Sequence, residues 1–377
     1  MASTSPPDLV IPAALRPADG RFGCGPSKVR PQALSALADT GTAYLGTSHR
    51  QAPVRDMVAR LRRGLQELLR PPAGYEVLLG NGGASLFWDA ASLGLITRRS
   101  QHLVFGEFSQ KFWAAAAAAP HLEAPERIDA EAGSHPLPRP APDVDAYALT
   151  HNETSTGVVM PIRRPDAPGL VLVDATSAAG AIPVELAAVD IYYFSLQKVF
   201  AADGGLWVAL CSPPAIATIE AIHRSGRWIP ASLSLQLALE NSRLDQTVNT
   251  PSLATLFLAV HQLEWMLEQG GLAFAAQRCV ANAEVVYGWA ESRPYASPFV
   301  ADPAMRSPVV ATIDLDPAIA ASTVCQVLRR NGIVDTESYR KLGRNQLRLG
   351  LFPAVEPDDC RRLVAAIDHV VAAIAPG

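Results

Sequence analysis

Lys198 follows an apolar run, DIYYFSLQ, at positions 190–197. The chain has 32 basic residues, and only four of them are lysines: Lys28, Lys111, Lys198 and Lys341. Arginine stays protonated in proteins, whereas a lysine in a desolvated pocket can lose its proton and attack a carbonyl carbon. A lysine where a buried strand is predicted to end therefore indicates carbonyl chemistry. An exposed strand-end lysine is the simpler explanation for Lys198 taken alone.

Asp174 lies 24 positions before Lys198, at the end of a second apolar run, LVLVD. Both residues fall at the carboxyl ends of neighbouring predicted strands, where open α/β sheets bind their ligands. A pyridoxal phosphate site needs these two groups, because an amine forms the imine with the aldehyde and a carboxylate keeps the ring nitrogen protonated. Asp174 alone would be explained as a helix N-cap. The pair favours the cofactor, since Lys28 in a Gly-Pro turn, Lys111 on a helix and Lys341 in a charged stretch fit the imine poorly.

A glycine-rich segment, GNGGAS at residues 80–85, follows another predicted strand and opens a predicted helix. A helix N-terminus offers free N–H groups to an anion, so this turn is a candidate cradle for the cofactor phosphate. Most glycine-rich turns are only turns, and this one lacks both the G-x-G-x-x-G spacing and a Walker lysine. Phe108 either stacks on the cofactor ring or packs its helix. Asn152 and Thr154 in HNET either reach the ring oxygen or form a polar turn.

The composition is that of an ordinary soluble globular protein, with 49% hydrophobic and 18% charged residues in 377. A net charge of −4 and the lack of a basic stripe argue against nucleic acid as a partner. No stretch approaches the roughly 20 apolar residues of a membrane helix, and the N-terminus does not resemble a signal peptide. Five cysteines without C-x-x-C spacing argue against zinc and disulfides, so we expect no metal and a cytoplasmic location.

Short apolar runs alternate with helical patterns along the first two-thirds of the chain. This alternation predicts an α/β fold, with a mostly parallel sheet of the seven-stranded type covered by helices. The expected strands are 75–79, 102–105, 147–150, 170–174, 190–195 and 206–210, and the expected helices are 53–70, 84–95, 108–119 and 213–223. Residues 120–145 contain six prolines and are interpreted as an exposed excursion.

A helical pattern over 252–292 is predicted to lead out of this domain into a smaller α+β domain. The expected elements there are a strand near 308–314, a helix at 318–331, strands near 333–336 and 346–350, and a last helix at 356–374. We therefore expect an N-terminal segment (1–20), a large cofactor-binding domain (21–265) and a small C-terminal α+β domain (266–377).

The chain resembles the phosphoserine aminotransferases, class V members of the fold-type I pyridoxal phosphate enzymes, in segments that run in order along nearly its whole length. These are FGCGPSKV, TSHRQ, GNGGAS, FGEFSQKF, HNETSTG, VDATSAAG, SLQK, VNTPS and RLGLF. The form is most similar to the variety found in actinobacteria. The SHR, NET, D…S and QK elements together are specific.

The resemblance implies a role for each matching residue. Those that would hold the cofactor are Lys198 as Schiff-base lysine, Asp174 at the ring nitrogen, Ala84 and Ser85 at the phosphate, Phe108 on the ring face, Thr154 and Gln197. The resemblance also implies an obligate homodimer with shared active sites, in which Asn249 and Thr250 would reach the cofactor phosphate of the neighbouring subunit. Those that would hold the substrate are His49 and Arg50 at its distal anion and Arg348 at its α-carboxylate, where a planar guanidinium binds in a bidentate manner.

The implied reaction is a reversible transamination between L-glutamate and 3-phosphohydroxypyruvate, giving O-phospho-L-serine and 2-oxoglutarate for serine biosynthesis. The family also allows 4-phosphohydroxythreonine, an intermediate of pyridoxine biosynthesis, as a substrate. One departure concerns the substrate phosphate: many relatives carry an arginine beside the glycine-rich turn, whereas this chain has GGASLFW there. Arg344 and Lys341 are the candidate replacements.

Three alternatives stay open. Another class V aminotransferase, acting on serine or alanine with glyoxylate, would share most of these motifs. A cysteine desulfurase needs a nucleophilic cysteine on a mobile loop, whereas Cys325 lies in a helical pattern. A non-catalytic regulator that binds the cofactor would need an added DNA-binding module, and no basic helix-turn-helix pattern is present.

Overall fold

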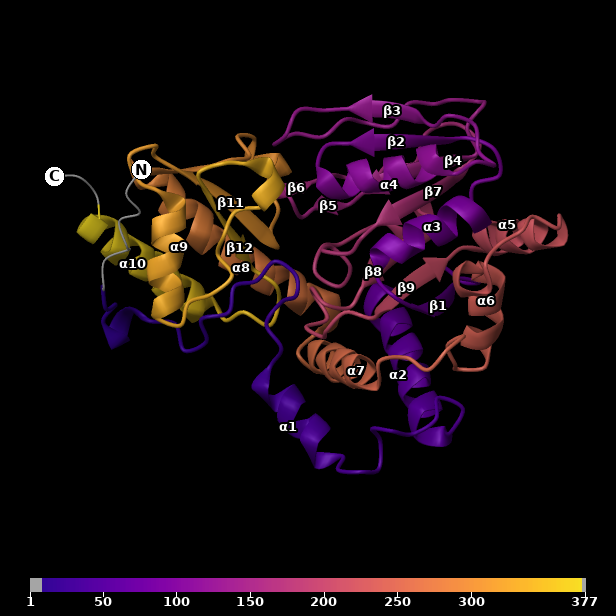
Figure 1. Ribbon diagram of the computed structural model, residues 1–377, viewed down its shortest axis with the longest axis horizontal. Helices are drawn as coiled ribbons and strands as arrows, with labels where there is room; N and C mark the ends of the chain where they lie inside the picture. The colour runs from indigo at the N-terminus through magenta and orange to yellow at the C-terminus, as the bar shows by residue number, and fades with distance from the viewer. Residues whose placement is uncertain (1–8, 375–377) are drawn as a thin grey trace.

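The computed structural model describes residues 9–374, so the first eight residues of the predicted N-terminal segment and the last three of the chain lie outside the described residues. Figure 1 shows a larger lobe built on a wide sheet and a smaller lobe formed mainly by the C-terminal part of the chain. None of the helices within residues 9–374 is long and apolar enough to cross a membrane.

The larger lobe contains a seven-stranded sheet in the order β1-β9-β8-β7-β4-β2-β3. β9 runs antiparallel to both of its neighbours, and the other pairs are parallel, which confirms the predicted mostly parallel sheet. The strands are β1 (Glu76–Asn81), β2 (Ser100–Val104), β3 (Glu126–Asp129), β4 (Ala146–Thr150), β7 (Leu170–Asp174), β8 (Ile191–Ser195) and β9 (Leu206–Cys211).

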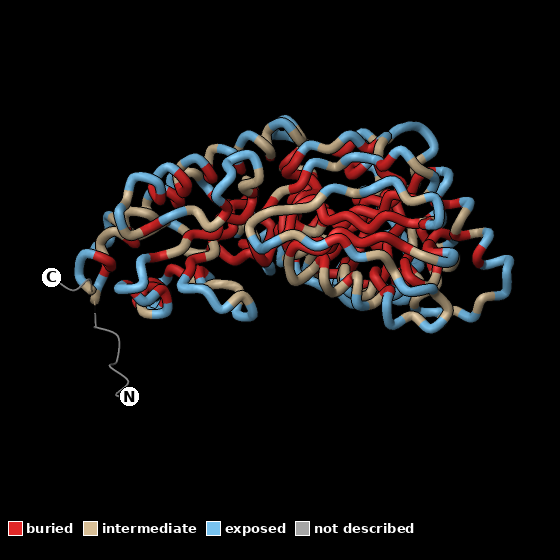
Figure 2. The backbone as a smooth tube through the Cα atoms, turned by 90° about the horizontal axis from the view of Figure 1, so that it is seen from above, coloured by how far each residue is buried: buried red, intermediate tan, exposed pale blue. Residues whose placement is uncertain are grey.

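Helices cover both faces of this sheet, as predicted. In β7, Val171 and Val173 pack into the core under α2 (Ala52–Leu69) and α7 (Leu253–Glu268), while the alternate leucines of the strand face the opposite core. That opposite core is formed with α3 (Ala84–Gly94), α4 (Glu107–Ala118), α5 (Pro213–Arg224) and α6 (Leu235–Arg243). Burial on both faces explains the continuous apolar runs, and each buried Val or Leu contributes about 1.5–3 kcal/mol. Figure 2 shows this buried layer in red at the centre of the larger lobe.

One prediction about a segment of the larger lobe was wrong in detail, and the predicted helical pattern that leads out of this lobe consists of two helices. Residues 120–145 are not only an exposed excursion, because β3 pairs there with the edge of the sheet. Its sequence, ERID, is polar and largely solvent-facing, as befits an edge strand, so no apolar run marked it. The helical pattern over 252–292 divides into α7 and α8 (Gly271–Glu291), because Gly270 and Gly271 both have positive φ values, 122° and 69°.

The smaller lobe is an α+β unit, as predicted. It contains an antiparallel sheet of β10 (Ala296–Pro298), β11 (Val310–Leu315) and β12 (Gln346–Gly350), covered by α9 (Ala321–Arg330) and α10 (Pro357–Ile374). β10 had not been predicted. The strand expected near 333–336 is wrong, because Val334 makes only an isolated bridge to Arg21. α8 joins the lobes, with Cys279 in the core of the larger lobe and Val286 in that of the smaller.

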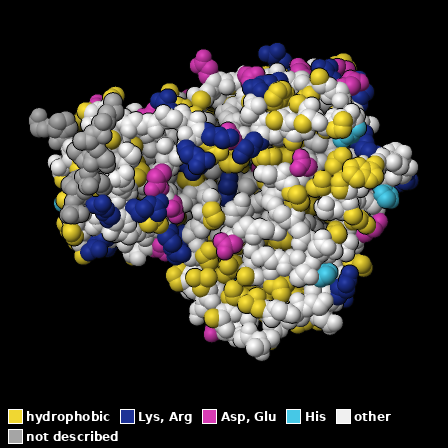
Figure 3. Space-filling model, in the orientation of Figure 1, with side chains coloured by type: hydrophobic (Ala, Val, Ile, Leu, Met, Phe, Trp, Pro, Cys, Tyr) yellow, Lys and Arg dark blue, Asp and Glu magenta, His cyan; other side chains and the backbone are white. Residues whose placement is uncertain are grey.

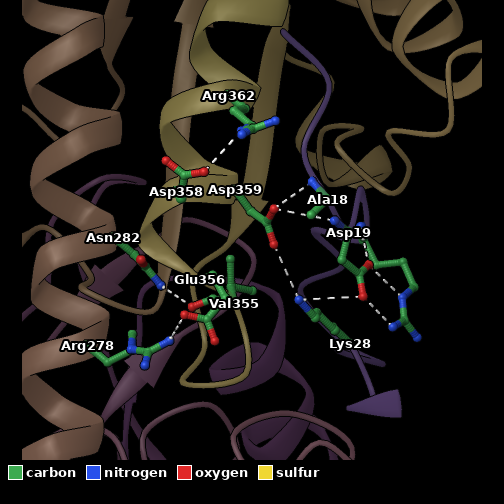
Figure 4. A network of polar contacts seen from close by, with 11 residues as sticks. Ala18, Asp19, Lys28, Arg278, Asn282, Val355, Glu356, Asp358, Asp359 and Arg362 are labelled. Carbon is green, nitrogen blue, oxygen red and sulfur yellow. Dashed lines mark hydrogen bonds and ion pairs between the residues drawn. The ribbon is translucent and has the colours of Figure 1, made fainter. Parts of the chain in front are cut away.

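An N-terminal strap (residues 20–28) lies between the lobes. The Phe22 N–H donates to Val334 O at 3.2 Å, and Phe22 O accepts from the Gly350 N–H at 2.7 Å. Figure 4 shows how the far end is held: the buried Lys28 Nζ lies 3.5 Å from a carboxylate oxygen of both Asp19 and Asp359. The strap therefore ties the smaller lobe to the chain that precedes α1 (Pro31–Asp39).

Candidate active site

A cavity of about 210 Å³ lies at the carboxyl ends of β4 and β7, whose last residues, Thr150 and Asp174, line it. The structure brings together there the predicted cofactor residues of one chain. The full lining consists of Gly25, Gly83, Ala84, Ser85, Trp88, Phe108, Thr150, Asn152, Thr154, Asp174, Thr176, Gln197 and Lys198.

Lys198 lies in the turn that follows β8, and its side chain is buried. Its Nζ donates to Thr154 Oγ1 at 2.6 Å and lies 4.9 Å from the centroid of the Phe108 ring. Burial lowers the pKa of the Lys198 amine to about 8, and the nearby Arg348 charge acts in the same direction, whereas the Asp174 carboxylate opposes it. An amine that loses its proton near neutral pH is suited to nucleophilic attack and to proton transfer.

The N-terminal strap fixes the backbone around this lysine. The Ser27 N–H donates to Gln197 O at 2.8 Å, and the Ser27 hydroxyl donates to Lys198 O at 2.5 Å. Gly25 has a φ of 141°, and a Cβ at this position would lie 3.0 Å from Lys198 Cε. A side chain at residue 25 would therefore press on the lysine. This steric limit explains why the second glycine of FGCGP, Gly25, stands there.

Asp174 is buried, and both of its carboxylate oxygens are held. Oδ1 accepts from the Thr176 N–H at 2.9 Å, and Oδ2 accepts from the Trp88 indole at 3.3 Å. The same indole N–H lies 3.0 Å from the Tyr193 hydroxyl. Sequence reasoning gave no role to Trp88 or Tyr193.

Glu153 was also missed, although it stands in the HNET segment. Its fully buried carboxylate accepts from the Phe108 N–H at 3.3 Å and from the Ser109 N–H at 3.0 Å, at the start of α4. It also accepts from the hydroxyls of Ser109, at 3.0 Å, and Ser155, at 2.7 Å. A carboxylate at a helix N-terminus is favoured by the free N–H groups there, and here it fixes the helix turn that carries the Phe108 ring.

The glycine-rich turn ends at the first residue of α3. Gly83 is the N-cap, and no side chain caps the helix. The Ala84 N–H donates to Ser195 Oγ at 2.6 Å, so β8 and α3 are joined beside the cavity. The exposed first turn of a helix binds anions such as phosphate. Gly80 is explained by packing and not by anion binding, because a Cβ there would lie 2.0 Å from the Trp207 ring.

Several buried polar atoms of the lining lack a partner in the part of the chain that the structure describes. They are Asn152 Oδ1, Thr176 Oγ1 and Gln197 Oε1. Buried polar groups are nearly always hydrogen-bonded, so these atoms indicate a polar ligand. Together with the amine, the carboxylate, the aromatic ring and the helix N-terminus, they fit pyridoxal phosphate.

The remaining predicted residues lie outside this cavity lining. Arg348 is close, since its Nη1 donates to Thr154 O at 3.3 Å and its guanidinium stacks 5.2 Å from the centroid of the Tyr339 ring. His49 Nδ1 lies 3.1 Å from Thr250 Oγ1, and the Asn249 N–H donates to an oxygen of Asn81, the last residue of β1. Arg50, Asn249 and Thr250 are exposed.

The two candidate replacements for the missing arginine are paired with carboxylates. Lys341 Nζ lies 2.5 Å from Glu107, and Arg344 lies 2.5 Å from Asp314. Figure 3 shows Lys and Arg side chains gathered in the hollow where the lobes meet. A substrate phosphate that reached either cation would have to compete with its carboxylate partner.

The cysteines do not provide the nucleophile of a desulfurase. All five are buried. Cys325 lies within α9, and burial raises the pKa of its thiol to about 11. A nucleophilic cysteine needs the opposite, an accessible thiol with a lowered pKa.

Comparisons with known proteins show the family of the chain. The family model of Aminotransferase class-V matches residues 139–336. A phosphoserine aminotransferase of Rhodococcus jostii (strain RHA1) is 54% identical over 364 residues, which cover 96% of this chain and 98% of that protein. A protein of Mycobacterium avium (strain 104), provisionally named phosphoserine aminotransferase, is 58% identical over 365 residues and covers 96% and 98% of the two chains.

Solved structures show the same fold. The phosphoserine aminotransferase of Cytophaga hutchinsonii superposes with a TM-score of 0.85 at 24% identity and covers 93% of this chain and 99% of that one. A phosphoserine aminotransferase from Trichomonas vaginalis with bound pyridoxal phosphate gives a TM-score of 0.78 at 20% identity, over 93% and 99% of the chains. The fold is that of a class V aminotransferase. Within this class, the chain belongs to the phosphoserine aminotransferase family.

Proposed function

We propose that this chain, with pyridoxal phosphate as its cofactor, transfers the amino group of L-glutamate reversibly to 3-phosphohydroxypyruvate, giving 2-oxoglutarate and O-phospho-L-serine. The observation that carries the proposal is the convergence of a buried amine, Lys198, and a buried carboxylate, Asp174, on one cavity at the end of the sheet. The full-length relatives that bear this enzyme's name support the choice of substrates.

The reaction divides between the cofactor and the chain. When bound, pyridoxal phosphate supplies an aldehyde and an electron-withdrawing ring that accepts the electrons of the broken Cα–H bond. Asp174 would keep the proton on the ring nitrogen. Lys198 Nζ would hold the cofactor at its aldehyde and would move the Cα proton of the substrate. With a pKa of about 8, this amine can both accept and return a proton near neutral pH.

The other cofactor roles follow from position in the cavity. Ala84 and Ser85 begin α3 and meet the phosphate with N–H groups and a hydroxyl. Phe108 covers one ring face. Thr154, whose hydroxyl accepts from Lys198 Nζ at 2.6 Å, and Gln197 complete the cofactor contacts.

Arg348 is assigned to the α-carboxylate of the substrate. It is half-buried, and its Nε has no hydrogen-bond partner among residues 9–374, which leaves a donor available beside the cavity. A guanidinium offers parallel donors that match the two oxygens of a carboxylate.

We assign the distal anion of the substrate to His49 and Arg50 of a neighbouring subunit, and part of the cofactor phosphate to that subunit's Asn249 and Thr250. The support is that Arg50, Asn249 and Thr250 are exposed outside the cavity of their own chain. Large apolar side chains are exposed in the chain that precedes these residues: Leu34 (48%) and Leu45 (45%) before Arg50, and Leu244 (57%) before Asn249. Exposed apolar side chains can be covered at a subunit interface, and we take the working unit to be a homodimer with shared active sites.

In the cell, we place the enzyme in the cytoplasm, in serine biosynthesis, with 4-phosphohydroxythreonine of pyridoxine biosynthesis as a second substrate. Neither nucleic acid nor a membrane is needed for this role. The family resemblance and the absence of charge and hydropathy patterns for those partners support this placement.

The test compares amino donors. With 2-oxoglutarate as acceptor, kcat/KM for O-phospho-L-serine should exceed that for L-serine by at least about 100-fold, because two hydrogen bonds to a charged group contribute about 3–6 kcal/mol. Lys198→Ala should abolish turnover, and Lys111→Ala, which removes a half-exposed lysine of α4, is the matched lysine control. Equal use of L-serine, or a preference for glyoxylate as acceptor, would assign the chain to another class V activity. Full activity of Lys198→Ala would remove the proposal altogether.

A further inference from the structure

An aromatic pair lies directly behind the Asp174 carboxylate. Trp88, on α3, lines the cavity and is 4% exposed. Its indole N–H is shared between Asp174 Oδ2 at 3.3 Å and Tyr193 Oη at 3.0 Å. Tyr193, on β8, is fully buried and pairs in register with Asp174 on the adjacent strand β7. The three polar groups therefore form one buried network, contributed by two strands and a helix.

The surrounding rings hold this pair in one orientation. Phe87 stacks on Tyr193 with 4.4 Å between ring centroids and 24° between planes. Phe112 lies parallel to Trp88, at 6.3 Å and 16°, and meets Tyr193 edge-on, at 6.1 Å and 87°. Such close packing leaves little room for another rotamer. The indole N–H and the phenol thus have a fixed direction toward Asp174.

The Tyr193 hydroxyl is bound to the Trp88 indole at 3.0 Å, and it lies near enough to the Asp174 carboxylate for that charge to act on it. It accepts from the indole N–H, so its own proton is free to donate to the carboxylate. Burial, together with the negative charge of Asp174, raises the pKa of the phenol well above its usual value, so the hydroxyl remains a donor at every working pH.

The Asp174 carboxylate can accept more hydrogen bonds than the protein donates to it. A carboxylate has about four acceptor sites. The Thr176 N–H and the Trp88 indole occupy two of them, and the Tyr193 hydroxyl lies beside the carboxylate on the protein side. Because Asp174 lines the cavity, a remaining site is available to a donor inside it. A protonated ring nitrogen is such a donor.

We propose that Trp88 and Tyr193 are positioning residues that aim the Asp174 carboxylate at the ring nitrogen of the cofactor. They touch neither the reacting carbon nor the substrate and act only through Asp174. The inference rests on the proposed function, because it takes Asp174 to be the partner of the cofactor ring. It adds a reason for a tryptophan in the GGASLFW segment, where an apolar side chain alone would fill the core.

The experiment measures how tightly the cofactor is held in Trp88→Phe, Tyr193→Phe, Asp174→Asn and the combinations with Asp174→Asn. The readouts are the dissociation constant of pyridoxal phosphate for the cofactor-free protein and the rate of cofactor release from the holoenzyme. Phenylalanine keeps the Tyr193 ring and removes only its hydroxyl, whereas at position 88 it removes the indole N–H together with one of the two fused rings. Trp113→Phe is the matched control, since its indole N–H is buried without a hydrogen-bond partner in the described chain. Equal unfolding midpoints for Trp88→Phe and Trp113→Phe show that both variants fold.

We expect Trp88→Phe and Tyr193→Phe each to weaken cofactor binding about tenfold, the lower end of the effect of a hydrogen bond to a charged group. Trp113→Phe should change it less than about twofold. In the Asp174→Asn background the further loss from Trp88→Phe should vanish, because coupled residues give non-additive effects. If Asp174→Asn weakens binding while both phenylalanine variants match the wild type, the positioning role is wrong and the proposed function stands. If Asp174→Asn itself binds normally, the assignment of Asp174 is wrong, and the positioning role falls with it.

Discussion

Lys198 gives the sharpest prediction, because a catalytic amine kept in a buried pocket should destabilise the cofactor-free protein. Burial lowers the pKa of this amine from 10.5 to about 8. At ~1.4 kcal/mol for each pH unit, that difference amounts to ~3 kcal/mol, by which the charged amine disfavours the folded state. Below pH 8 the amine is charged in both states, and the full destabilisation is present.

The effect depends on pH with a definite sign. Between about pH 8 and pH 10.5 the unfolded chain holds the proton and the folded protein has released it, so the free energy of unfolding rises with pH. Lys198→Met removes this rise. It also removes the hydrogen bond to Thr154, worth ~1 kcal/mol, although Thr154 keeps its bond to Ser177 at 2.9 Å. The variant should therefore be about 2 kcal/mol more stable than the wild type at pH 7 and lose this advantage above about pH 10.

The assay is urea unfolding of the cofactor-free proteins at one protomer concentration, at pH 7 and about pH 9.5. Lys111→Met, which removes a half-exposed lysine, should change the free energy of unfolding by less than about 0.5 kcal/mol at both values. A Lys198→Met variant that is less stable than the wild type at pH 7, or a difference that does not shrink as pH rises, would refute the reasoning.

Three further predictions concern the strap and the substrate. Lys28→Met leaves the buried Asp359 carboxylate shown in Figure 4 without its cation, whereas Asp19 keeps Arg21, and should lower the free energy of unfolding by about 3–5 kcal/mol, measured with urea; a loss below about 1 kcal/mol would contradict this. Gly25→Ala puts a Cβ 3.0 Å from Lys198 Cε at a φ of 141°, so kcat should fall about tenfold or more while the protein still folds; wild-type kcat would show that the strap moves aside. Arg348→Lys keeps the charge but loses the bidentate fork, so KM for glutamate should rise about 10–100-fold with the cofactor absorption unchanged; an unchanged KM would place the α-carboxylate elsewhere.

The positions of Lys198 and Asp174 could be predicted because each follows an apolar run, and an apolar run between turn residues marks a strand buried on both faces. Parallel strands then bring their carboxyl ends to one edge, which is where the structure has both residues. The polar edge strand β3 could not be found in this way, since half of its residues face solvent and its sequence shows no apolar pattern.

Contacts between segments that lie far apart in the chain could not be predicted from the sequence. Trp88 and Asp174 are 86 positions apart, and nothing in GGASLFW distinguishes an indole that donates to a carboxylate from one that fills the core. Gly80 was attributed to an anion cradle, whereas the structure shows that a Cβ there would collide with the Trp207 ring. The buried Glu153 was hidden in a polar segment because its partners, the first N–H groups of α4, come from 44 and 45 positions earlier.

The central claim is that Lys198 and Asp174 hold pyridoxal phosphate for exchange of an amino group between glutamate and a phosphorylated keto acid. The most direct measurement is a visible absorption titration of the purified holoenzyme, first with L-glutamate and then with 3-phosphohydroxypyruvate. We expect glutamate to bleach the band of the bound cofactor and the keto acid to restore it, which shows both half-reactions in one cuvette. A band that glutamate leaves unchanged would contradict the amino donor, and the lack of any band after pyridoxal phosphate is added would contradict the site itself.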